Sequence, residues 1–239
     1  MKGRGIVFVA LSAMTLGVWL WGLPATNSTE GQAGTICPRG QCPVQPEAAR
    51  QAPRAAVQWP PRLGASYPDL ELVDQTGQRV RLSSFKGLVM LVEPVGMTCP
   101  ACQAFSGAHL FGSFGGIVPQ QGLPSVGELF PRYANELSLS DNRIVLVQIL
   151  LYGMSMDAPS PEDAKRWAEH FKMDRSKNRV VLAGTKDLLV QASYDMIPGF
   201  QLVDRNFILR ADSTGHRPRH NLFHELLPMI PQLLQEQVR

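Results

Sequence analysis

A short, continuous apolar run leads directly into a pair of closely spaced cysteines. Residues 88–92 are all Leu, Val or Met, and Glu93-Pro94 closes the run. An apolar run of this length, without polar alternation, is typical of a central strand that is buried on both faces. Cys99-Pro100-Ala101-Cys102 follows within a few residues. The two cysteines are therefore expected where this strand gives way to a helix.

The spacing of the two cysteines fits dithiol chemistry. Residues three apart on a helix lie about one turn apart, close enough for a disulfide to open and close between them. Cys99 would lie at the helix N-terminus, where free backbone N–H groups and the helix dipole favour the attacking thiolate. Cys102 would be the sheltered, resolving sulfur. A purely structural disulfide is less favoured, because so short a ring adds little entropic stabilisation.

The remaining sequence predicts strands that alternate with helices, which is the α/β class. The expected strands are 70–73 and 79–82 as a β-hairpin, 143–151, 180–183, and 200–203 with 207–209 as a second hairpin. Three helices are expected. The first begins at a Ser160 cap, the second runs from Leu188 to Tyr194, and the third closes the chain from Arg219. Pro228 and Pro231 should kink or split the third helix. We predict a mixed central sheet flanked by helices, with an N-terminal β-hairpin.

The start of the chain has the pattern of an export signal or membrane anchor. Lys2 and Arg4 precede an uncharged stretch, 5–29, and positive residues before an apolar run keep the N-terminus in the cytoplasm. The length suits either a signal peptide or a marginal spanning helix. Bulky Leu23 makes a poor cleavage site, so an uncleaved anchor over 5–23 is favoured, with secretion after cleavage as the alternative. Either way, the rest of the chain is expected in a bacterial periplasm.

Three regions are expected along the chain. Residues 1–24 would form the signal anchor or signal peptide, 25–62 a flexible linker rich in Pro, Ala and Gln, and 63–239 the folded domain. The linker holds Cys37 and Cys42. We interpret this pair as a small disulfide-closed loop, and a second redox or metal site is the alternative.

The order of these features resembles a known family. Residues 70–102 combine the hairpin, a short turn at 83–87, the buried run and the cysteine pair. They look like the TlpA-type branch of the thioredoxin superfamily, which includes the cytochrome c maturation thioredoxins. The resemblance extends to residues 196–204 and so covers nearly all of 63–239. It implies a thioredoxin-like fold and an exchange of dithiols with disulfides.

The resemblance also implies a substrate-binding loop at Ile197 and Pro198. In the family, a cis proline faces the two cysteines, and the backbone beside it pairs with the substrate chain. Pro198 would take that place. An ordinary trans proline in a turn is the alternative, since most X-Pro bonds are trans.

Glu93 is the third candidate catalytic residue. It stands six residues before Cys99, where thioredoxins carry a buried acid behind the second cysteine. Burial raises the pKa of a carboxyl toward neutrality, which would suit Glu93 to exchange a proton with Cys102. A strand-end Glu that reaches solvent or pairs with a Lys is the alternative.

Two features depart from the family pattern. Thr98 stands where the family usually has Trp before the first cysteine. The stretch between Cys102 and Pro198 is also longer than a minimal thioredoxin needs. Part of the excess is 112–127, which is rich in Gly and Pro. This segment is interpreted either as a lid or docking loop near the sulfurs, or as a surface excursion without function.

Copper binding is the main alternative function. Residues 96–102 also look like the metal loop of small heavy-metal-associated domains, in which two thiolates hold Cu(I). A periplasmic Cu(I) carrier or copper-site assembly factor would use the same two cysteines. SCO-type copper proteins share the thioredoxin fold, but they place three residues between their cysteines and a His near the position of 196–198. Neither feature occurs here.

Two further patterns are weaker. A peroxiredoxin motif can be started at Pro94 and Thr98, but its Cys position then falls on Ala101. Three histidines are spaced four residues apart near the C-terminus: His216, His220 and His224. Pro218 interrupts the first interval, so a metal site there is not favoured.

Together these patterns predict a protein thiol–disulfide oxidoreductase that acts through Cys99 and Cys102. Its partners would be protein disulfides or dithiols and a membrane thiol-electron donor. The family resemblance favours a reductant over an oxidant. No cofactor is implied, and a net charge of only +3 without a basic stripe gives no indication of nucleic acid binding.

Overall fold

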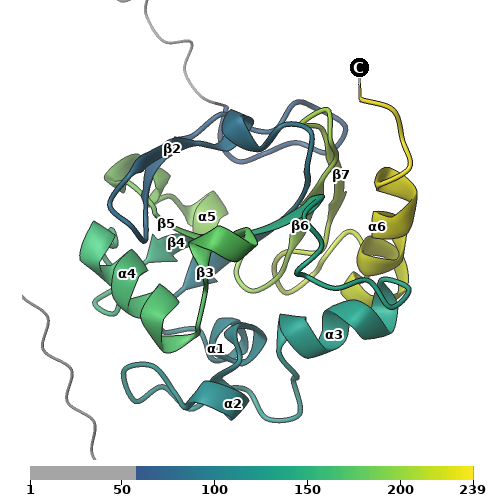
Figure 1. Ribbon diagram of the computed structural model, residues 1–239. Helices are drawn as coiled ribbons and strands as arrows, with labels where there is room; N and C mark the ends of the chain where they lie inside the picture. Colours follow the sequence, from purple (N-terminus) through teal and green to yellow (C-terminus); the bar gives the residue numbers. More distant parts are fainter. Residues whose placement is uncertain (1–57, 239) are drawn as a thin grey trace, which may run out of the picture. The chain divides into compact units, whose positions relative to one another are not determined.

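A seven-stranded mixed sheet organises the computed structural model, which describes residues 58–238 (Figure 1). Its strands are β1 (Glu71–Asp74), β2 (Arg79–Arg81), β3 (Val89–Gly96), β4 (Ile144–Tyr152), β5 (Arg179–Ala183), β6 (Gln201–Val203) and β7 (Leu209–Asp212). Across the sheet the order is β2-β1-β5-β4-β3-β6-β7. The three strands β3, β4 and β5 are parallel, and every other neighbouring pair is antiparallel.

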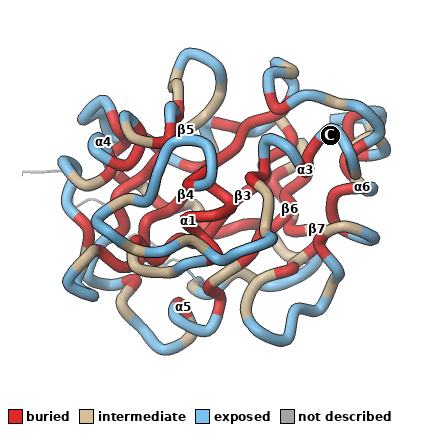
Figure 2. The backbone as a smooth tube through the Cα atoms, turned by 90° about the horizontal axis from the view of Figure 1, so that it is seen from below, coloured by how far each residue is buried: buried red, intermediate tan, exposed pale blue. Residues whose placement is uncertain are grey.

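Both faces of the central strands are covered, since every residue of β3 and β4 is buried. The α-helices are α1 (Pro100–Ser106), α2 (Ala108–Phe111), α3 (Val126–Tyr133), α4 (Pro161–His170), α5 (Gln191–Asp195) and α6 (Leu227–Leu233). Helix α1 directly follows β3, and α4 packs against β5 and β1. Figure 2 shows the buried central strands inside a rim of exposed loops.

This arrangement is a thioredoxin-like fold, as the sequence predicted. The hairpin β1–β2, the buried strands β3, β4 and β5, and the pair β6–β7 all form where they were expected, give or take a few residues. Helix α4 also starts as predicted, because the Ser160 hydroxyl accepts the Asp163 N–H and the Asp163 carboxylate accepts the Ser160 N–H.

Strand β3 is longer than predicted. It continues through Glu93-Pro94 to Gly96, so Glu93 lies within the strand and not at its end. Pairing with β4 extends past the proline, at Val95 with Leu150, whereas pairing with β6 stops at Val92. Beyond that point β3 has a neighbour on one side only, the setting in which a strand accommodates proline.

Two other elements begin or end at different residues than predicted. The helix expected from Leu188 to Tyr194 is split into a 3₁₀ turn, Lys186–Leu188, and α5, because Val190 between them is extended. Strand β7 begins at Leu209 instead of residue 207, because Phe207 has a positive φ of 69° inside the turn.

The C-terminal segment is divided but continuous. A π-helical stretch, Leu222–Leu226, passes directly into α6. Pro228 falls in the first turn of α6, where the π-helical stretch changes to an α-helix, and Pro231 lies inside α6. The division expected near this proline is therefore a change of helix type and not a break.

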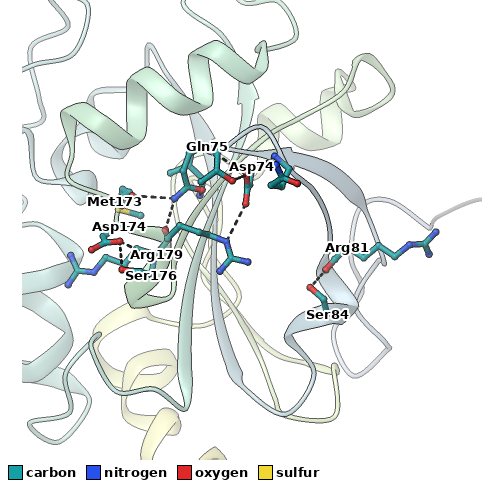
Figure 3. Close-up of polar contacts among 12 residues, drawn as sticks. Asp74, Gln75, Arg81, Ser84, Met173, Asp174, Ser176 and Arg179 are labelled. Atoms are coloured by element: carbon teal, nitrogen blue, oxygen red, sulfur yellow. Dashed lines mark hydrogen bonds and ion pairs between the residues drawn. The ribbon is translucent and has the colours of Figure 1, made fainter. Parts of the chain in front are cut away.

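Polar side chains fasten the N-terminal hairpin to the sheet (Figure 3). The Gln75 amide donates to the carbonyl oxygens of Met173 and Arg179, at 3.2 and 2.8 Å, and accepts the Val181 N–H at 2.9 Å. The adjacent Asp74 carboxylate closes the hairpin turn by accepting from Thr76 and Gln78. The hairpin is thus tied to β5 through side chains as well as through backbone pairing.

The described part of the chain already packs against the core at Trp59, whose indole N–H donates to the Ser193 hydroxyl at 2.7 Å. The packed region therefore starts before residue 63, the domain start that the sequence suggested. The expected anchor over 5–23 and the Cys37–Cys42 pair lie outside the described residues. Between residues 58 and 238, no helix is long and apolar enough to cross a membrane.

A stability prediction follows from Gly199, which connects Pro198 to β6. Its φ is +140°, and a Cβ there would collide with the Ser213 carbonyl oxygen and lie 2.7 Å from the Thr214 Cα. We expect Gly199→Ala to lower the free energy of unfolding by about 1–3 kcal/mol, measured by urea denaturation. The matched control is Gly127→Ala in α3, where the nearest atom would be 3.8 Å away and the substitution should be neutral or stabilising. Equal losses in both variants would contradict this explanation.

Candidate active site

The two cysteines lie at the start of α1, as predicted. Cys99 is the residue that caps this helix, and its sulfur accepts the backbone N–H of Cys102 at 3.3 Å. Cys99 is half-buried, whereas Cys102 is fully buried, and both are free thiols. One sulfur is therefore open to a partner and the other is reachable only from within the protein.

Their surroundings give the two thiols opposite acidities. The side-chain hydrogen bond from Cys102 lowers the pKa of Cys99 to about 7; the N–H groups of Cys102 and Ala101 add to this effect, and burial opposes it. Burial raises the pKa of Cys102 well above its ordinary value, and the negative charges of Cys99 and Glu93 raise it further. Near neutral pH, Cys99 is therefore the thiol that ionises, and Cys102 keeps its proton.

Glu93 lies within the apolar interior, in the middle of β3. Its side chain is 0% exposed, and its Oε2 accepts a hydrogen bond of 2.7 Å from Gln148 Nε2 on β4. Its other oxygen, Oε1, has no hydrogen-bond partner among the described residues. Burial raises the pKa of this carboxyl well above its ordinary value, against the opposing effect of the Gln148 hydrogen bond. A Glu that reaches solvent or pairs with a Lys, the alternative raised above, is excluded.

A pocket of about 240 Å³ opens beside Cys99. Ile197 and Pro198, joined by a cis peptide bond, line it together with the cysteine. Gly96 borders both residues, since a Cβ there would lie at ordinary contact distance, 3.4 Å from the Ile197 Cδ1 and 3.6 Å from the Cys99 Cβ. The structure thus brings Ile197 and Pro198 next to Cys99, although they lie far apart in the sequence.

Aromatic and thioether side chains also line the pocket, and no sequence pattern indicated them. The pocket is lined by Tyr152 at the end of β4, by Met156 in the loop that follows β4, and by Tyr194 on α5. The rings of Tyr152 and Tyr194 meet edge to face at 5.9 Å, and the Tyr152 hydroxyl donates to the Val190 carbonyl. Met156 and Tyr194 remain 47% and 52% exposed. No periodicity could have revealed them, because they come from a loop and a short helix.

The segment 112–127 does not cover this pocket. None of its residues lines the pocket beside Cys99. Its Phe114 backbone is held by the Gln103 side chain at 2.8 and 3.0 Å, and the Phe114 ring packs on Trp167 at 5.3 Å. The segment is therefore packed against α1 and α4 at Phe114, and its Gln120 N–H donates to the carbonyl of Pro100, the residue after Cys99, at 3.0 Å. A docking loop near the sulfurs stays a prediction.

The C-terminal histidines do not form a cluster. His216 lines the pocket beside Cys99, whereas the His220 ring accepts the Asp212 N–H and the His224 ring packs against Tyr133. No group of three potential metal ligands occurs within residues 58–238.

No protein-family model matches the chain, and no curated protein is significantly similar to it. Several solved structures are. The thioredoxin domain of a thiol-disulfide oxidoreductase from Bacteroides vulgatus is 18% identical, over 66% of this chain and 89% of that chain, with a TM-score of 0.41. A SCO1/SenC family lipoprotein from Bacillus anthracis str. Ames is 17% identical, over 72% and 97%, with a TM-score of 0.49. A thiol:disulfide interchange protein from Bacteroides sp. is 19% identical, over 62% and 79%, with a TM-score of 0.40. At such identities, function has to be inferred from this chain's own side chains.

The thiol asymmetry predicts how Cys99 reacts with iodoacetamide. With Cys37 and Cys42 replaced by Ser in every variant, alkylation of the reduced protein should modify Cys99 alone, with a rate that is half-maximal near pH 7, the pKa of its thiol. In Cys102→Ala, which removes the hydrogen bond to Cys99, the midpoint should rise toward about 8.5. Cys102→Ser keeps a donor at the same place, so its midpoint should stay closer to that of the unsubstituted protein. Identical midpoints in both variants would show that the Cys102 side chain does not stabilise the thiolate.

Proposed function

We propose that this protein is a thiol–disulfide oxidoreductase that acts on protein disulfides through Cys99 and Cys102. The observation that carries this proposal is the pairing of a half-buried, acidic thiol with a fully buried, weakly acidic one, close to a buried carboxyl. A structural disulfide would need neither this asymmetry nor the pocket beside Cys99. Enzymes place such perturbed groups in clefts, where their acidities fit the reaction.

The first step is attack on the substrate. The Cys99 thiolate attacks one sulfur of a substrate disulfide and forms a mixed disulfide with it. The other substrate sulfur leaves as a thiolate and takes a proton from solvent. Ile197 and Pro198 lie beside Cys99 in the same pocket and would hold the substrate chain during this step.

The second step releases the product. Cys102 gives its proton to the Glu93 carboxylate, and its sulfur then attacks the Cys99 sulfur. The Cys99–Cys102 disulfide forms, and the bound substrate sulfur leaves as a thiolate. The substrate disulfide has then gained two electrons and the cysteine pair has lost two. A membrane thiol-electron donor would restore the dithiol in the direction we favour, in which the protein is a reductant.

We place this activity outside the cytoplasm. Lys2 and Arg4 before the apolar stretch favour a membrane anchor over residues 5–23, or secretion after cleavage, into a bacterial periplasm. A dithiol kept reduced in an oxidising compartment needs a dedicated electron supply. The membrane donor and the anchor are therefore parts of one proposal.

Reduction of insulin disulfides by a chemical reductant, with the protein as catalyst, tests the activity. Cys99→Ser should abolish turnover, because it removes the attacking sulfur. The double variant Cys37→Ser/Cys42→Ser should keep it. The reduction potential and the Cu(I) affinity of the Cys99–Cys102 pair are measured alongside. A tight stoichiometric Cu(I) complex with negligible turnover would contradict the proposed enzyme and favour the alternative function, a copper carrier or copper-site assembly factor.

A second prediction concerns the exposed side chains beside Cys99. Each of Tyr194→Ser and Met156→Ser removes apolar surface that a substrate chain would cover, so the KM for insulin should rise about fivefold with little change in kcat. A small soluble disulfide should react equally well with all variants. The matched control is Val118→Ser, an exposed apolar residue (70%) outside the pocket. If Val118→Ser changes the KM as much, the pocket is not the docking site.

A further inference from the structure

Gln148 holds the buried carboxyl of Glu93 from the neighbouring strand. The two residues are directly paired in the register of β3 and β4, and both are 0% exposed. Gln148 Nε2 donates to Glu93 Oε2 at 2.7 Å and to the Ser106 hydroxyl at 2.8 Å. Both hydrogens of the amide are thereby used.

Trp167 fixes which way this amide points. Its indole N–H, on α4, donates to Gln148 Oε1 at 3.0 Å. An indole nitrogen can only donate, so it requires the oxygen of the amide to face α4 and the nitrogen to face Glu93. The reversed amide would put its nitrogen against the indole N–H and its oxygen against the carboxylate. The orientation of Gln148 is therefore set by chemistry and not only by packing.

We infer that Gln148, oriented by Trp167, is a positioning residue that assigns the exchangeable proton of the site to Oε1 of Glu93. An amide nitrogen cannot accept a hydrogen bond, so Oε2 facing it can serve only as an acceptor. The oxygen left without a partner is Oε1. A proton on Glu93 therefore resides on Oε1.

The same contact adjusts the acidity of Glu93 without fixing its charge. No cation pairs with Glu93 among the described residues, and the charged or titratable groups that act on it are the thiols of Cys99 and Cys102. Burial raises the pKa of Glu93 and favours the protonated acid, and the hydrogen bond from the neutral Gln148 amide opposes this effect only in part. The carboxyl can therefore take up and release a proton as the thiols change charge.

This inference rests on the proposed function, in which Cys102 gives its proton to Glu93. Proton acceptance needs the deprotonated carboxylate, so the rate of the resolving step should rise with pH through the pKa of Glu93. Loss of the donor on Gln148 destabilises the carboxylate and moves that rise to higher pH. The resolving step should then be slower at neutral pH, while the first attack by Cys99 is unchanged.

The test is a titration of the Glu93 carboxyl by ¹³C NMR in the full-length protein, with Glu93→Gln used to assign the signal. Gln148→Leu should raise its pKa by about one to two pH units, the loss expected for a hydrogen bond to a charged group. Trp167→Phe keeps an aromatic ring and removes the indole N–H together with part of the buried indole, so it should shift the pKa in the same direction by a smaller amount. The pH profile of the resolving step, followed by stopped flow, should move with the titration in each variant.

The control is Ile149→Val, which removes buried apolar volume from the next residue of β4 and touches no polar group. It should leave both the titration and the pH profile in place. An unchanged Glu93 pKa in Gln148→Leu overturns the inference, and if that variant does not fold, an unchanged pKa in Trp167→Phe overturns it. If the titration shifts as expected but the unsubstituted protein does not reduce insulin, the proposed function fails while the role of Gln148 stands.

Discussion

A carboxyl group inside a fully buried strand is the constraint on which the rest of the site depends. Burial of an ionised carboxylate is expensive, so the group must be either protonated or hydrogen-bonded. Here Glu93 on β3 requires an amide at the paired position of β4, and that amide, Gln148, requires a donor from α4, Trp167. Three elements from distant parts of the chain are thereby tied to one ionisable group.

The asymmetry of the two thiols comes from the same arrangement. Cys99 caps α1 at the surface, where backbone N–H groups and the Cys102 thiol stabilise its negative charge. Cys102, one turn further, enters the interior close enough to Glu93 for the two charges to oppose each other. A thiolate at Cys102 is thus disfavoured until its proton has a place to go. The fold separates attack from resolution by position alone, because both residues have the same side chain.

The sequence predicted those elements of the fold that are determined by residues close together along the chain. The apolar run at 88–92, the Ser160 cap and the cysteine spacing each follow rules that act within a few residues, and each predicted element is present. Gln148 could not be recognised in the same way, because within an apolar strand it reads as a single polar exception. Its role depends on the register between β3 and β4, which places it opposite Glu93. Tyr194 likewise lines the pocket from the short helix α5, and no sequence pattern links it to Cys99.

A neutral amide suits this position better than a cation would. A Lys or Arg beside Glu93 would stabilise the carboxylate strongly, lower its pKa and hold it charged throughout the cycle. A permanently charged carboxylate next to Cys102 would keep the pKa of that thiol high and could return no proton to it. With an apolar neighbour instead, the carboxyl would stay protonated and could accept none. The donor on Gln148 lies between these limits, so protonation of Glu93 remains responsive to the charge on the two sulfurs.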